Sequence, residues 1–309
     1  MRKKFISKKR RIRFKYKFLF FLFIFLLSIY ITFQILLKSS VKINDKDFVK
    51  IILSNSYNKK NSTISEIVKQ IEKKYSPVDL LMTSYYDLKV PVKTVKKEIK
   101  KKNDDFKIYI YNTHQTEEYA PNSFLEGQVR PTVMISSYIM EEVFGKNGYN
   151  TLVEERSISE QLKNNNWKYY KSYDASRIYM DDAKKNNPTI EYFIDVHRDS
   201  LSKDKTTIEI NNKSYAKTIF LIGTENPNYQ ENLDFVTKIN NILNEKYPNL
   251  SKGIYQKGGA GVNGVYNQDN SKHTMLVEIG GPDNTTDEVL NSTLAFCDAF
   301  LEVISKNEG

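Results

Sequence analysis

The run IEYFIDV at residues 190–196, followed directly by His197, decides the fold. It is apolar on both faces, which is typical of a central strand covered by helices. The runs FKIYIYN at 106–112 and TMLVEIG at 274–280 have the same character. Amphipathic helical patterns alternate with these strands to the end of the chain. Residues 105–309 are therefore predicted to form one α/β domain, a mostly parallel twisted sheet flanked by helices.

Two helices can be predicted between these strands. Pro131 suits the first position of a helix through PTVMISSYIMEEVF, with Gly145 ending it. An apolar stripe ahead of Pro248 predicts a second helix, with one face formed by Leu233, Val236, Ile239 and Leu243. Cys297, the only cysteine, lies on a similar stripe near the C-terminus. We expect it to be a core residue rather than a nucleophile.

The charge of the chain is concentrated at its N-terminus. The sequence has 47 Lys/Arg and 37 Asp/Glu, but the first 37 residues hold ten basic residues and no acidic one. The other 272 residues therefore carry 37 charges of each sign. A neutral body lacks the basic surface that nucleic acid binding requires, so no nucleic acid partner is expected.

An uncharged stretch follows the basic residues. Residues 18–37 read FLFFLFIFLLSIYITFQILL, which as a helix would span about 30 Å, the thickness of a hydrocarbon core. The exit KSSV offers a poor site for signal-peptide cleavage. We expect a permanent transmembrane helix rather than a buried helix of a soluble protein. The positive-inside rule then places the basic tail, residues 1–17, in the cytoplasm and makes this a single-pass cell-membrane protein with the remainder outside.

Residues 38–104 have the composition of a linker. They are rich in Lys, Asn and Ser, contain helix-like patches at 46–53 and 64–74, and end in the charge run KKEIKKKNDD. Such charge runs are usually solvated. We therefore predict a partly helical stalk that carries the domain at 105–309.

Two of the three histidines occupy equivalent positions. His114 and His197 each follow a predicted strand, and the carboxyl ends of strands line the binding crevice of open α/β sheets. Glu278 lies within the apolar run MLVEIG, where an ionised carboxylate is costly unless it is paired or functional. Two neutral imidazoles and carboxylates in one crevice indicate a Zn²⁺ site with an open coordination position.

Each of these residues also has a structural interpretation. A histidine at a strand end can be a hydrogen-bonded structural group, and Glu278 can pair with a nearby arginine such as Arg198. The joint placement at three strand ends favours a site. His273 lies at the opposite end of its strand from Glu278, and we expect it to be structural or at the surface.

Four strings, in this order, carry a resemblance to a known family: IYIYNTHQTEEY, SYDASR, FIDVHRDS and VEIGGPDNT. Together with the basic N-terminus they resemble the stage II sporulation protein P family, cell-wall hydrolases of endospore-forming bacteria. The likeness covers about residues 106–300 and none of the stalk. It implies an α/β fold similar to that of zinc-dependent N-acetylmuramoyl-L-alanine amidases, in which His, Glu and His hold the metal and a further Glu is catalytic.

Carried over residue by residue, the resemblance makes His114 and His197 metal ligands and Glu278 the catalytic glutamate. The third ligand is assigned to Glu126, which lies ahead of GQVRPTV as in the related amidases. Glu117, within THQTEEY, is the alternative.

The expected chemistry follows from the metal. Zn²⁺ held by His114, Glu126 and His197 would lower the pKa of a bound water to about 7. Glu278 would take the proton as this water attacks an amide carbonyl and then deliver it to the leaving amine. Arg198, next to a ligand, is a candidate for stabilising the oxyanion; its structural alternative is an ion pair with Asp199 or Glu278.

One of two aspartates near His197 is expected to orient its imidazole. Asp195 is preferred to Asp199, because residues two apart on a strand point to the same side.

The resemblance implies peptidoglycan as the substrate, cut between N-acetylmuramic acid and L-alanine, with additional endopeptidase cutting of peptide cross-links. It also implies stage II sporulation proteins D and M as partners during engulfment of the forespore. The alternative is a non-catalytic, membrane-anchored wall-binding scaffold. Its support is Asn112, which stands where the family often has a histidine. We prefer His114 as the ligand because it lies farther out of the sheet.

Overall fold

The structure is a computed structural model that describes residues 20–28, 30, 45, 46, 49, 53, 105–120 and 131–307. The chain divides into two compact units, residues 1–43 and 44–309. The sheet and all elements labelled below belong to the second unit.

In the first unit, residues 20–28 and 30 are helical. Their apolar side chains are exposed, with Phe21 67% and Phe23 63% accessible. Among the residues that the structure describes, no helix is long and apolar enough to cross a membrane. The rest of the predicted anchor at 18–37, and the whole of the basic tail, lie outside the described residues.

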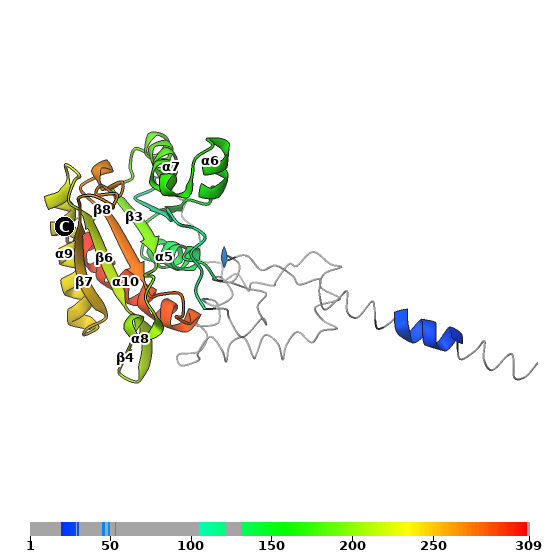
Figure 1. The fold of residues 1–309 in the computed structure, drawn as a ribbon. Coiled ribbons are helices and arrows are strands. Elements are labelled where there is room, and N and C mark those ends of the chain that lie inside the picture. Colours follow the sequence, from blue (N-terminus) through cyan, green and yellow to red (C-terminus); the bar gives the residue numbers. More distant parts are fainter. Residues whose placement is uncertain are drawn as a thin grey trace, which may run out of the picture. The chain divides into compact units, whose positions relative to one another are not determined.

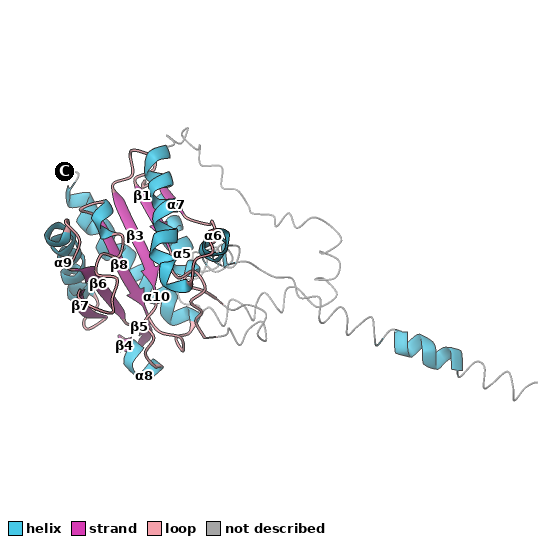
Figure 2. Ribbon diagram, turned by 45° about the horizontal axis from the view of Figure 1, so that its top comes forward, coloured by secondary structure: helices cyan, strands magenta, loops and turns pink. Residues whose placement is uncertain are grey.

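A six-stranded sheet forms the centre of the second unit (Figures 1 and 2). Its order is β2 (Thr151–Val153), β1 (Ile108–Tyr111), β3 (Tyr192–His197), β8 (Thr274–Ile279), β6 (Thr218–Gly223), β7 (Ser251–Lys257). Neighbouring strands are parallel except β8 and β6, which are antiparallel. A separate antiparallel hairpin consists of β4 (Thr207–Ile210) and β5 (Lys213–Ala216). The expectation of a mixed α/β fold with a mostly parallel sheet is confirmed.

Helices cover both faces of this sheet. One face packs against α5 (Met134–Lys146), α9 (Tyr229–Lys246) and α10 (Thr286–Asn307). The other face carries α7 (Ser172–Asn186) over β1 and β3, and α6 (Ile158–Asn164) packs on α7. The remaining helical turns are short: α8 (Lys203–Thr206), η2 (Tyr169–Lys171) and η3 (Gln268–Asn270).

The strands are buried because successive side chains serve different layers. On the α7 side, Tyr109, Tyr111 and Phe193 form a cluster with Met180 and Ala183 of the helix. On the opposite side, rings of the sheet and of the helices stack on one another, among them the pairs Tyr192 with Phe235 and Phe144 with Phe300. Burial of such rings stabilises the fold by about 1.5–3 kcal/mol each.

The predicted helix at Pro131 begins later than expected. Its first residue is Met134, and it continues past Gly145 to Lys146. The carbonyl of Pro131 accepts a hydrogen bond from Tyr119 N at 2.8 Å, and Thr132 forms an isolated antiparallel bridge with Glu118. Extended pairing at these two residues prevents them from joining the helix.

Part of the predicted stalk packs on the domain. Residues 45, 46, 49 and 53 are helical, as the patch at 46–53 predicts, and Val49 and Leu53 are buried. Asp45 Oδ2 accepts a hydrogen bond from Thr132 Oγ1 at 2.6 Å. At these residues the chain is therefore docked rather than a solvated linker. The rest of 38–104 lies outside the described residues.

Candidate active site

Strand register brings two of the predicted site residues side by side. His197 and Glu278 are direct partners where β3 and β8 end. Because both strands run in the same direction, the two side chains project from the same face of the sheet. The Glu278 carboxyl is partly buried there, and burial raises its pKa above the usual value. Among its charged neighbours the His197 cation lowers that pKa most, whereas Asp199 raises it.

His114 reaches the same place from the turn after β1. Its ring centroid lies 5.1 Å from that of His197, with the two planes nearly perpendicular. Tyr169 stacks on His114 at 4.8 Å, and Tyr173 approaches it edge-on at 5.8 Å. Burial, and next the neighbouring His197, lower the pKa of His114. His114 is therefore a neutral imidazole at neutral pH.

Two carboxylates flank His197, which is almost fully buried. Its Nε2 lies 3.0 Å from Asp195 Oδ1, and its Nδ1 lies 3.6 Å from Glu117 Oε2. The Asp195 contact is short but not aligned along an N–H bond, so we treat it as electrostatic. Burial disfavours the imidazolium, but Asp195 and Glu117 outweigh it and raise the pKa of His197 to about 10. Metal binding at this residue would have to displace a proton.

Asp195 is itself held by a network of hydrogen bonds. It accepts from Thr113 N at 2.9 Å and from Thr113 Oγ1 at 2.7 Å. Thr113 Oγ1 also shares a hydrogen bond with Ser176 Oγ on α7 at 2.9 Å. Asp199, the other candidate for orienting the imidazole, instead pairs with Lys252 at 3.0 Å. Of the two aspartates, the structure places Asp195 beside His197.

The structure describes only one of the two candidates for the carboxylate ligand. Glu117 lies at the site, where its Oε2 also accepts from Arg198 N at 3.1 Å. Burial opposes its ionisation, but its contact with His197 and this backbone hydrogen bond keep its pKa below the usual value. Glu126 lies outside the described residues.

Among the described residues, Arg198 forms no ion pair with Asp199 or Glu278, the partners of its structural alternative. Its Nε donates to the carbonyl of Glu118 at 2.7 Å, and its Nη1 donates to the carbonyl of Asp199 at 3.0 Å. The guanidinium thus joins the segment after β1 to the segment after β3.

Asn112 is directed away from this cluster. The side chain is fully buried, donates to the carbonyl of Val196 at 2.7 Å and accepts from Ser137 Oγ of α5 at 2.8 Å. Position 112 therefore serves the packing between β1, β3 and α5.

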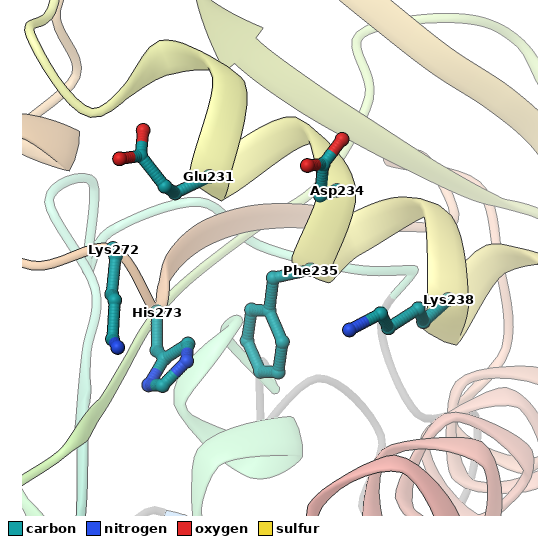
Figure 3. Close-up of a pocket in the computed structure, with 6 residues that line it drawn as sticks. All are labelled: Glu231, Asp234, Phe235, Lys238, Lys272 and His273. Carbon is teal, nitrogen blue, oxygen red and sulfur yellow. The ribbon is translucent and has the colours of Figure 1, made fainter. Parts of the chain in front are cut away.

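His273 lies at the other end of the sheet, as expected from its position before β8. It stacks on Tyr192 at 5.1 Å. It lines an open cavity of about 410 Å³ with Glu231, Asp234, Phe235, Lys238 and Lys272 (Figure 3). Burial, and next the Lys272 charge, lower its pKa. This cavity is distinct from the cluster around His114 and His197. Cys297 is fully buried, as expected of a core residue.

The two imidazoles can be tested as metal ligands on their unpaired atoms. His114 Nδ1 is buried and has no hydrogen-bond partner among the described residues. A buried nitrogen without a partner is costly, and a metal ion would satisfy it. Within the described ranges, however, no three His, Cys, Asp or Glu side chains are placed to hold a metal. The histidine pair fits a metal, and the described residues do not complete its ligand set.

The aromatic residues of the site were not predicted from the sequence. Tyr173 lies between His114, His197 and Tyr266, and Tyr169 covers His114. Tyr173 belongs to the string SYDASR, which was a signal that could have identified it. No comparable signal marks Tyr169.

The fold and this cluster together define an α/β protein with an imidazole and carboxylate centre at one end of its sheet. A model of the Stage II sporulation protein P family matches residues 39–301. The chain therefore belongs to this family. The match begins near residue 39, so the expectation that the likeness starts at about residue 106 was wrong.

One relative and two solved structures are also similar to this chain. Stage II sporulation protein P of Bacillus subtilis (strain 168) is 36% identical over 204 residues, 63% of this chain and 50% of the relative. The chain thus spans about half the length of that relative. The CwlD amidase of Clostridioides difficile, solved with the GerS lipoprotein, is 11% identical with a TM-score of 0.43 and covers 65% of this chain and 99% of its own. An N-acetylmuramoyl-L-alanine amidase of Clostridium difficile 630 is 8% identical with a TM-score of 0.37 and covers 66% and 96%. Structural likeness at this level does not transfer an activity.

Proposed function

We propose that this protein is a peptidoglycan hydrolase that cleaves the amide between N-acetylmuramic acid and L-alanine. Membership of the sporulation family supports a role at the cell wall. The observation that carries the chemistry is the meeting of His114, His197 and Glu278, far apart in the chain, at one end of the sheet. Such a combination of imidazoles and a carboxyl of raised pKa is suited to hydrolysis.

The cofactor we propose is Zn²⁺, held by His114, His197 and one glutamate. Glu126 remains our first assignment for that glutamate and Glu117 the alternative, which is supported by its position 3.6 Å from His197 Nδ1. When bound, zinc supplies a water that loses its proton near neutral pH and a positive charge for the developing oxyanion.

Glu278 is proposed to move the proton. Its raised pKa suits a carboxyl that must accept a proton from the attacking water and release it again. The proton then passes to the amine that leaves when the amide carbon–nitrogen bond breaks. One carboxyl therefore acts first as base and then as acid.

The neighbouring residues position this group. Asp195 fixes the His197 ring from the side away from Glu117, because the two carboxylates contact different ring nitrogens. Arg198 donates hydrogen bonds from Nε and Nη1 to backbone carbonyls, and these bonds hold the segments carrying Glu117 and His197 together. Stabilisation of the oxyanion by Arg198 stays a prediction.

The cellular setting is also proposed. Residues 18–37 would anchor the protein in the cell membrane with its N-terminus in the cytoplasm, so that the domain reaches the wall from outside. A protease added to intact protoplasts should then cut the domain, and its protection would contradict this topology. Stage II sporulation proteins D and M are the partners we propose.

The non-catalytic scaffold loses its main support. That alternative depended on Asn112, but this side chain makes two hydrogen bonds inside the core. An amide at this position is therefore compatible with a working site.

The proposed function is tested with the purified full-length chain and isolated cell walls. We expect about one zinc per chain by metal analysis and the release of new amino groups from the walls. Loss of release in a chelator, and its return with added zinc, would support the metal. Wall binding without amine release would favour the scaffold, and release that resists the chelator would contradict the zinc mechanism.

A further inference from the structure

The turn η2 places an exposed aromatic ring on the candidate site. Tyr169 stacks on His114 with ring centroids 4.8 Å apart and planes 18° from parallel. The side chain is nevertheless 60% exposed. One face of the ring therefore covers a site imidazole while much of its remaining surface is open to solvent.

Both sides of this turn are fixed to the fold. Before it, Trp167 packs on the cluster that joins α6 to α7, and its backbone N donates to Leu162 O at 2.8 Å. After it, Ser172 Oγ donates to the carbonyl of Tyr169 at 2.6 Å. Because the turn is held at both ends, the Tyr169 ring is positioned before any ligand arrives. Preorganised groups of this kind bind with a smaller entropic cost.

The surroundings of the ring select an uncharged ligand with a flat apolar side. Glu117 and Arg198, which have opposite charges, both act on Tyr169, so the surroundings favour neither an anionic nor a cationic ligand. A pyranose ring carries no charge, has an apolar C–H face and presents hydroxyl groups at its edge. An exposed tyrosine, with an apolar body and a polar tip, matches both features.

We propose that Tyr169 is a sugar-binding platform that stacks a pyranose ring of the glycan strand next to the scissile amide. This inference rests on the proposed function, since it names the part of peptidoglycan that the site holds. The Tyr169 ring separates this sugar from His114, so the sugar is a neighbour of the one whose lactyl amide is cut. Its contribution should depend on glycan length.

A purely structural role for Tyr169 predicts a different result. If the ring only kept His114 in place, its removal would lower kcat for every substrate, because the same imidazole serves all of them. A platform instead affects the KM of substrates that possess the neighbouring sugar.

The test compares full-length wild type with the variants Y169A, Y169F and Y170A. Tyr170 is the matched control because it is 74% exposed in the same turn. The substrates are soluble peptidoglycan fragments with long glycan strands and a single-sugar N-acetylmuramoyl peptide. For Y169A we expect KM for the long strands to rise about three- to tenfold more than KM for the single-sugar substrate. Y169F keeps the stacking face and loses the polar tip, so its KM for the long strands should rise less than that of Y169A, whereas Y170A should behave as wild type.

Equal loss of kcat on both substrates, or an unchanged KM for long strands, would overturn the platform and leave the hydrolase intact. A binding measurement on peptide-free glycan strands separates the two proposals further. In the E278Q background, Y169A should weaken binding by the same factor while Y170A does not. If wild type hydrolyses neither substrate, the proposed function itself fails, and equal glycan binding with and without Y169A would then remove the platform too.

Discussion

The two ends of the sheet each hold a histidine stacked on a tyrosine, but the charged group that acts most on each histidine has the opposite sign. At one end, Asp195 and Glu117 flank His197 and raise its pKa to about 10. At the other end, burial and the Lys272 charge lower the pKa of His273 (Figure 3). Aromatic stacking therefore does not distinguish a site from a structural position here. The carboxylates at the carboxyl ends of β1, β3 and β8 distinguish the candidate site from the structural position.

The largest effect is expected from His197→Ala. The variant should lose both bound zinc and amine release from cell walls, because the imidazole is a proposed ligand and the contact point of two carboxylates. Metal analysis and a wall digestion assay measure the two losses in one preparation. Retention of stoichiometric zinc would show that His197 is not a ligand.

Glu278→Gln should separate catalysis from metal binding. Replacing the proton carrier by an amide of the same shape should lower kcat about 10²–10⁴-fold, while zinc content stays at the wild-type level. The Michaelis constant should change little, since no binding group is removed. Full activity in this variant would contradict the role assigned to Glu278.

Asp195→Asn tests whether the carboxylate beside His197 supports zinc binding. We expect zinc affinity to fall about 10–100-fold, as is typical when the partner of a ligand histidine is lost. Equilibrium dialysis at fixed pH gives this value. An unchanged affinity would mean that Asp195 does not orient the ring.

The same variant has a pH signature in metal-free protein. The pKa of His197 is raised from about 6.5 to about 10. Its charge therefore stabilises the fold below pH about 6.5, and this contribution is lost as pH rises through 10. The free energy of unfolding of Asp195→Asn should fall furthest below wild type near pH 6, and the difference should narrow towards pH 10. Asp199→Asn, which removes the partner of Lys252 and leaves Asp195 in place, is the matched control. It should lack this narrowing, because the contacts of His197 are unchanged.

The smallest effect is expected from His273→Gln. Its ring packs between Tyr192 and Phe235, so the variant should lose about 1 kcal/mol of stability and keep wild-type turnover. Thermal unfolding and the wall assay check both statements. A loss of turnover comparable with that of His197→Ala would remove the distinction between the two ends.

The sequence predicted the half of the sheet that carries the candidate site. The strands β1, β3 and β8 lie within two residues of the predicted runs, because central strands are buried on both faces and read as continuous apolar segments. The direction of β6 could not be read in this way. This strand follows the β4–β5 hairpin rather than a crossover helix, and so enters the sheet beside β8 from the opposite direction. Chain direction depends on such connections and not on local pattern.

The candidate site likewise contains residues that the sequence could predict and residues that it could not. His114, His197 and Glu278 could be placed together because each is tied to a strand end, where register fixes its neighbours. Tyr169 and Ser176 come from the segment that includes η2 and α7. Their positions depend on how that layer packs over the sheet, which no spacing in the sequence reveals.

The hydrogen bonds of Asn112 hold the end of the sheet that carries His114 and His197 from the opposite face. This amide joins β1 to the carbonyl just before His197, and it does so from the layer occupied by α5. The separation of the two imidazoles is thus set partly by a residue that no substrate can touch. Substitutions in that buried layer would therefore alter the spacing of the two imidazoles without replacing either of them.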